Sequence, residues 1–323
     1  MTWVVWRQQR PVFITLFAGL VVSVTAILLW RAGMVADVAA GNLADCVVKG
    51  FEACRVKAAD DFQDAWFDKL HVAQGTVIAA PAVIGVFVGA PLFAREFEQG
   101  THTLAFTQSV SRTRWMVTKF LVAAVPALVV VAVYQFAVQS WLEVAGHLGP
   151  LSTGEFYFTT FESQGVSPIA YTIFAYTLGM VAGALFKRTL VAMTLTLGLF
   201  IAARVVVGGA REFLIEPTRL ITNDLDDNRV LPGNPLVVRS GFLDAKGAVV
   251  ADPTPMMNCA AKGDAQKIPD WDTCYRENGL AQRYADIIPA EQATTLHLLE
   301  ASVFAGFAVL FVLGAVWAVR RQV

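Results

Sequence analysis

Six apolar blocks constrain the fold of this chain more than any other feature of its sequence. They cover residues 12–30, 76–94, 120–140, 168–186, 189–207 and 296–319, and none holds more than one acidic or basic residue. A helix of about 20 residues crosses a hydrocarbon core of about 30 Å. Because backbone groups in lipid must be satisfied within the protein, each block is predicted to be a helix. The composition agrees, since 56% of the residues are hydrophobic and 16% are charged. The sequence therefore predicts an all-α polytopic membrane protein with six transmembrane helices.

The charged residues between the blocks predict how the chain is oriented. One set of block ends carries the basic residues Arg7, Arg10, Arg95, Arg112, Arg114, Lys119, Lys187, Arg188, Arg320 and Arg321. The opposite segments are acidic, with seven acidic residues in 31–75, three in 141–166 and thirteen in 208–293. By the positive-inside rule the basic ends face the cytoplasm, so both termini are expected there.

The first block is longer than the apolar part of a signal peptide, and an uncleaved anchor is expected. A net charge of -1 gives no indication of nucleic-acid binding.

The four cysteines all fall in segments assigned to the outer side, where disulfides can form. Cys46 and Cys54 lie in residues 31–75, and Cys259 and Cys274 lie in residues 208–293. Four cysteines can pair in three ways. The way with two local bridges, Cys46 to Cys54 and Cys259 to Cys274, needs the least rearrangement of the chain. Four unpaired thiols are the alternative. No zinc site is predicted, because the chain has no C-x-x-C pair and its histidines are scattered.

The blocks and the segments between them define the expected organisation of the chain. Residues 31–75 are predicted to be helical, with Asp60, Asp61, Asp64 and Asp68 on a solvated face and Phe62, Trp66, Phe67 and Leu70 opposite. Residues 208–293 are predicted to form a small outer domain with a hairpin over 236–250. The expected parts are 1–30 (interfacial helix and first span), 31–75, 76–94, 95–119, 120–207 (third to fifth spans), 208–293 and 294–323 (sixth span and tail).

Two ionisable residues interrupt the apolar blocks. Arg204 lies about one turn inside the outer end of the fifth span, and Glu300 lies at a similar depth in the sixth. Charges within spans are costly and usually paired or directed at a cavity. An Arg204–Glu300 ion pair or a substrate-facing polar site is one interpretation, and snorkelling of both side chains to the interface is the other. His297 lies three residues before Glu300, but one His and one Glu are too few for a metal site, so none is predicted.

Two pairs of glycines have the G-x-x-x-G spacing that allows helices to approach closely. These are Gly85 with Gly89 and Gly179 with Gly183. Packing within one chain is the expected use, rather than a contact between subunits.

Residues 95–119, REFEQGTHTLAFTQSVSRTRWMVTK, form the only sizeable inner segment and are the candidate contact surface for a partner. Gly100 can provide a sharp bend at positive φ. A charge reversal at Glu98 is expected to disturb the contact without affecting any span. A solvated connector is the alternative.

The chain has no G-x-x-x-x-G-K-[ST] phosphate loop, so ATP binding of the usual kind is not expected. H-E-x-x-H and G-x-S-x-G are absent as well, which disfavours an intramembrane protease or lipase.

The same segment resembles a known family. ABC-2-type permeases are the membrane subunits of ATP-binding-cassette exporters, and they carry an E-x-G-T … V-S-R … K pattern between their second and third spans. This chain has a similar pattern at Glu98-Gln99-Gly100-Thr101, Val110-Ser111-Arg112 and Lys119. The chain also resembles the high-GC Gram-positive bacterial branch of these permeases, at Thr2-Trp3, Trp6-Arg7-Gln8 and Lys187-Arg188-Thr189. The resemblance covers all six spans and leaves 208–293 weakly covered. Gln108 departs from it, because many members carry Pro before V-S-R.

The resemblance implies a permease that does no covalent chemistry and holds no cofactor. Residues 95–119 would be the coupling helix, with Glu96, Glu98, Gly100, Thr101, Val110, Ser111 and Arg112 contacting the ATPase. Expected partners are two copies of an ATPase subunit that binds ATP and Mg²⁺, a second permease subunit in a homodimer or heterodimer, and the lipid bilayer. The expected location is a bacterial cell membrane. The expected substrate is hydrophobic or amphipathic, as in multidrug or antibiotic efflux. The alternative from another class is a membrane-anchored receptor or immunity protein that binds an extracellular ligand without transport.

Overall fold

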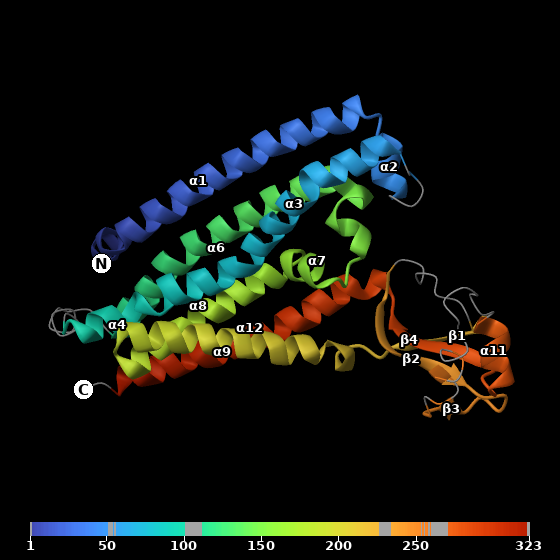
Figure 1. The fold of residues 1–323 in the computed structure, drawn as a ribbon. Coiled ribbons are helices and arrows are strands. Elements are labelled where there is room, and N and C mark those ends of the chain that lie inside the picture. Colours follow the sequence, from blue (N-terminus) through green and yellow to red (C-terminus); the bar gives the residue numbers. More distant parts are fainter. Residues whose placement is uncertain are drawn as a thin grey trace. The chain divides into compact units, whose positions relative to one another are not determined.

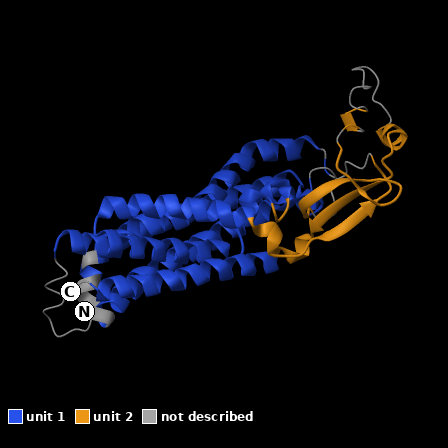
Figure 2. Cartoon of the chain, turned by 90° about the horizontal axis from the view of Figure 1, so that it is seen from below, with its two compact units in different colours: residues 1–153, 157–209, 294–323 blue, residues 154–156, 210–293 orange. Residues whose placement is uncertain are grey.

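The computed structural model describes residues 2–50, 54, 56–100, 112–225, 234–252, 254, 256–257, 259 and 271–321. The chain divides into two compact units, coloured separately in Figure 2. The first unit comprises residues 1–153, 157–209 and 294–323, and the second comprises residues 154–156 and 210–293.

The first unit is a bundle of helices (Figure 1). Its elements are α1 (Thr2–Ala40), α2 (Ala44–Lys49), α3 (Lys57–Ile84), the π-helical turn η2 (Gly85–Gly89), α4 (Pro91–Glu98), α6 (Arg112–Ala145), the short 3₁₀ turns η3 (Gly146–Leu148) and η4 (Pro150–Thr153), α7 (Phe158–Ser163), α8 (Ser167–Phe186), α9 (Thr189–Gly209) and α12 (Ala293–Arg320). Among the described residues, six helical stretches are long and apolar enough to cross a membrane, which confirms the predicted number of spans.

Where the structure describes residues 31–75 they are mostly helical, but α1 and α3 extend into the adjoining spans, and α2 is the one separate helix among the described residues. α1 continues to Ala40, because the first helix-breaking pair is Gly41 with Asn42, whose φ is 51°. α3 starts at Lys57 and continues directly into the second span. Its predicted faces are present, with Phe62, Trp66 and Leu70 buried and the four aspartates exposed, but Phe67 is only half-buried.

The two G-x-x-x-G motifs are used within the chain, as predicted, and they pack on each other. A Cβ added to Gly85 would lie 2.7 Å from the Ala175 carbonyl oxygen, and one on Gly89 would lie 2.5 Å from the Tyr176 carbonyl oxygen. From the α8 side, a Cβ on Gly179 would collide with the Gly85 carbonyl oxygen. The missing side chains therefore allow η2 and α8 to touch through their backbones.

One end of the bundle brings together the start of α1, the end of α4, the start of α6 and the α8–α9 junction (Figure 1). The end of α12 lies there as well, because Ala318 and Val319 share a buried cluster with Phe97 and Trp115. These are the helix ends that carry the basic residues of the sequence, and we call this region the basic end. Lys187 ends α8 in the left-handed conformation, with φ 57°, and α9 begins two residues later.

The second unit contains a four-stranded antiparallel sheet with the strand order β1-β4-β2-β3. The strands are β1 (Thr218–Thr222), β2 (Leu236–Leu243), β3 (Val249–Val250) and β4 (Gln282–Ile288). The predicted hairpin is present as β2 and β3, and its turn is fixed by Asp244 Oδ1, which accepts from the N–H groups of Lys246 and Ala248 at 2.8 Å. β1 and β4 were not predicted. β1 exposes four of its five side chains and shows no alternation of buried and exposed positions.

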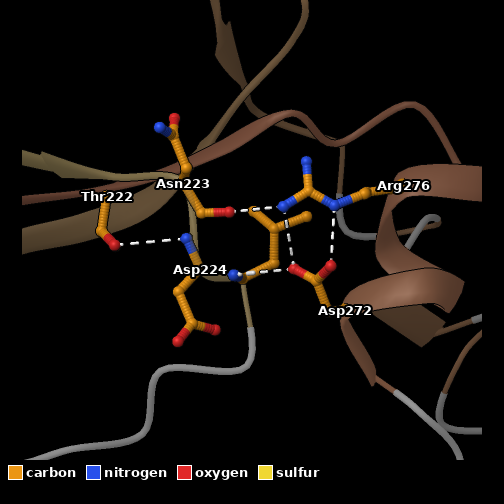
Figure 3. Close-up of polar contacts among 6 residues, drawn as sticks. Thr222, Asn223, Asp224, Asp272 and Arg276 are labelled. Carbon is orange, nitrogen blue, oxygen red and sulfur yellow. Dashed lines mark hydrogen bonds and ion pairs between the residues drawn. The ribbon is translucent and has the colours of Figure 1, made fainter.

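Ion pairs link the elements of the second unit. Arg219 on β1 donates to both carboxylate oxygens of Asp286 on β4, at 2.6 and 2.8 Å. On α11 (Trp271–Glu277), Asp272 binds Arg276 and accepts from the N–H of Leu225 at 3.1 Å (Figure 3). Arg276 also donates to the Asn223 carbonyl oxygen, so α11 is held against the segment that follows β1.

Candidate functional site

The chain bends at Gly100, where α4 has ended and the inner segment begins. Gly100 has a φ of 69°, a conformation that L side chains rarely adopt, which confirms the predicted bend. A Cβ added there would meet no atom within 4 Å. Backbone conformation, and not lack of space, therefore requires glycine at this position.

A buried ion pair joins the two helices that flank residues 101–111. Glu96 on α4 pairs with Lys119 on α6, and their side chains are only 13% and 3% exposed. The Lys119 ammonium also lies 4.8 Å from the centre of the Trp115 ring. Removing one charge would leave the other buried and uncompensated, which is costly.

Glu98 contacts a third helix. Its Oε2 accepts from the Thr189 N–H at 3.0 Å and from the Thr189 hydroxyl at 2.7 Å. Thr189 is the first residue of α9, where backbone N–H groups have no partner within the helix and where the helix dipole favours a negative charge. The expectation that a charge reversal at Glu98 would affect no span is therefore wrong, because Glu98 caps the fifth span. Sequence spacing gave no signal for this contact across the α8–α9 junction.

The remaining predicted contact residues are described less completely. Thr101, Val110 and Ser111 lie outside the described residues, and Arg112 begins α6 without a described side chain. Their contact with an ATPase stays a prediction. We call Glu96, Glu98, Gly100, Lys119 and Thr189 the elbow base.

A second polar cluster lies at the other end of the spans. Arg204 on α9 pairs with Glu162 on α7, and its guanidinium carbon lies 3.3 Å from the centre of the Tyr171 ring. The Tyr171 hydroxyl donates to Glu300 Oε1 at 2.7 Å. Tyr171 on α8 therefore touches both of the ionisable residues that the sequence singled out.

The structure revises the interpretation of Arg204 and Glu300. In the structure, Arg204 pairs with Glu162. Glu162 belongs to the acidic segment 141–166, which is predicted to lie on the outer side, but α7 returns this residue to the bundle, where its side chain is 3% exposed. A direct Arg204–Glu300 pair stays a prediction. Snorkelling is wrong, because the Arg204 side chain is 11% exposed and Glu300 is fully buried.

His297 belongs to the same region. Its Nδ1 lies 2.6 Å from the Ser167 hydroxyl, and its ring stacks on Phe161 with the ring centres 3.9 Å apart. Among the described residues, no three His, Cys, Asp or Glu side chains gather in a way that could hold a metal ion.

Both predicted disulfides are present. Cys46 is joined to Cys54 in the first unit, with Cα atoms 5.4 Å apart, and Cys259 to Cys274 in the second, with Cα atoms 5.8 Å apart. Each bridge closes a short loop of its own unit.

Comparison with known proteins identifies the family. A family model described as "ABC-2 membrane transporter related" matches residues 17–211, more than half of the chain. Comparisons with curated proteins and with solved structures gave no match. The match runs from within the first membrane helix to just beyond the fifth, and it includes the whole elbow base. The chain is therefore a multi-pass membrane protein that belongs to the family of ABC-2-related membrane transporters.

Proposed function

We propose that the chain is the permease subunit of an ABC exporter, which forms the translocation pathway and couples to a separate ATPase subunit through residues 95–119. Two ATPase subunits that bind ATP and Mg²⁺ and a second permease subunit complete the transporter. The basic end faces the cytoplasm of a bacterial cell, and the substrate is hydrophobic or amphipathic.

The observation that carries the proposal is the elbow base. Glu96 ties the segment's first end to α6, and Glu98 ties it to α9. α4 itself continues from α3 through η2. A displacement of residues 101–111 by a partner would therefore act on the second, third and fifth spans together. A solvated connector has no need of a buried ion pair and a helix cap at its start.

Gly100 is the position at which the proposal can be tested without disturbing a packed side chain. Valine is strained at a φ of 69°, so Gly100→Val should change the direction in which the segment leaves α4. Gly247 offers a matched control, because its φ is 77°, no atom lies within 4 Å of its added Cβ, and it belongs to the hairpin turn of the second unit.

The experiment is affinity purification of the tagged full-length chain from its native membranes, followed by identification of stoichiometric partners. The wild type and Gly247→Val should recover a protein with a G-x-x-x-x-G-K-[ST] loop. Gly100→Val should insert normally and recover much less of it. Equal recovery with both variants would show that residues 95–119 are a connector. Recovery of the wild-type chain without any ATPase would overturn the proposal and favour a receptor that binds ligand without transport.

A further inference from the structure

A cavity of about 680 Å³ opens at the basic end, between α1, α4, α6 and α9. Cavities of this size hold drug-sized ligands. The charged residues that line it are Arg7, Arg95, Glu96, Glu98 and Lys119. Because Lys119 is 3% exposed and held by Glu96, the cavity has a fixed polar floor.

The charges of the cavity favour an anion. Glu96 is engaged by Lys119, and Glu98 is engaged by the N–H and hydroxyl of Thr189. Arg7 on α1 and Arg95 on α4 are both exposed and reach the same cavity from two helices. The cations of the lining thus exceed the anions by one, and guanidinium groups match the geometry of phosphate oxygens.

Part of the cavity lining is apolar, and this part distinguishes a lipid from a soluble anion. It includes Val12, Phe87 and Leu92, which we call the apolar wall. Phe87 belongs to η2 within the second span, and 59% of its surface is exposed. An apolar side chain exposed within a span suits contact with acyl chains, so the apolar wall would connect the charged floor with the bilayer. A free phosphate would leave this wall uncovered.

We propose that the cavity binds an anionic phospholipid, with the headgroup phosphate held by Arg7 and Arg95 and an acyl chain lying along Val12 and Phe87. The bound lipid lies against the Glu96–Lys119 pair and the Glu98–Thr189 contact. Lipid binding therefore stabilises the elbow base and makes it sensitive to the anionic content of the membrane. The site stands on the cavity and its charges, whether or not an ATPase docks nearby.

The test is a lipid titration of the delipidated full-length chain followed by native mass spectrometry, with phosphatidylglycerol and phosphatidylcholine of identical acyl chains. At about 1 kcal/mol for each basic residue near a lipid headgroup, the double variant Arg7→Gln/Arg95→Gln should bind phosphatidylglycerol about 30-fold more weakly. Arg10→Gln/Arg320→Gln is the matched control, because it removes two exposed arginines from the same end but outside the cavity lining. It should keep the preference for phosphatidylglycerol.

Two further arms separate a lipid from other occupants. Phe87→Ala should weaken phosphatidylglycerol binding while it leaves the charged floor intact, and glycerol 3-phosphate should compete poorly. Equal losses in the two double variants would reduce the effect to surface charge and overturn the proposal. Effective competition by glycerol 3-phosphate would assign the cavity to a soluble anion. Displacement of the lipid by a co-purified ATPase would assign it to a protein contact.

Discussion

Substitutions in the Glu96–Lys119 pair test how much the stability of the chain depends on this buried contact. Glu96→Gln removes the carboxylate that pairs with an ammonium whose side chain is 3% exposed. Breaking a buried pair in this way costs about 3–5 kcal/mol. The Trp115 ring still faces the ammonium at 4.8 Å, and Glu96 is 13% exposed, so we expect the lower limit of about 3 kcal/mol.

The double variant Glu96→Gln/Lys119→Met separates loss of the pair from loss of one partner. Replacing both charges leaves no buried ion, so its stability should lie within about 1 kcal/mol of the wild type. The assay is thermal unfolding of the full chain in detergent, where about 3 kcal/mol corresponds to a fall of roughly 6–12 °C in the midpoint.

An exposed pair in the same unit provides the control. Lys49 and Asp45 on α2 lie 3.9 Å apart with side chains 63% and 86% exposed, so Asp45→Asn should change stability by less than about 1 kcal/mol. Equal effects of Glu96→Gln and Asp45→Asn, or a double variant less stable than Glu96→Gln alone, would refute this account of the pair.

Three other predictions follow from the packing and charges. Gly179→Ala should lower the thermal midpoint by an amount equivalent to about 1–3 kcal/mol, because its Cβ would collide with the η2 backbone; Gly198→Ala, which meets no atom within 4 Å, should not lower it. Hydrogen bonds from Arg219 lower the pKa of Asp286, and those from Arg276 lower the pKa of Asp272. The second unit should therefore keep its protection from hydrogen exchange above the ordinary carboxyl pKa and lose protection as the pH falls through these lowered values, with a smaller loss in Arg219→Gln. In a double-mutant cycle, Arg204→Ala and Glu162→Ala should be non-additive in thermal stability, and additive effects would mean that the pair contributes nothing.

Sequence patterns predicted the features that depend on local composition. Apolar length gave the six spans, and glycine spacing gave close helix packing within the chain, although it did not show that the two motifs contact each other. The positive φ at Gly100 followed from the need for a bend between two charged helix ends. Each of these depends on residues within a few turns of one another.

The contacts that sequence reasoning missed join residues far apart in the chain. Glu162 lies 42 positions before Arg204, and nothing in the 141–166 composition shows that α7 returns this acid to the bundle. Glu98 contacts Thr189, which lies 91 positions later in the chain, where α4 packs against both α8 and α9. The strand β1 exposes most of its side chains and therefore gives no alternating pattern.

The central claim is that residues 95–119 contact an ATPase, and photo-crosslinking tests it directly. Benzoylphenylalanine would replace Phe106 in the inner segment, and in a separate chain it would replace Phe213, which is 76% exposed in the second unit. Irradiation of native membranes should link position 106, and not position 213, to a protein that carries a phosphate loop. Absence of that adduct from position 106, or the same adduct from both positions, would contradict the coupling role.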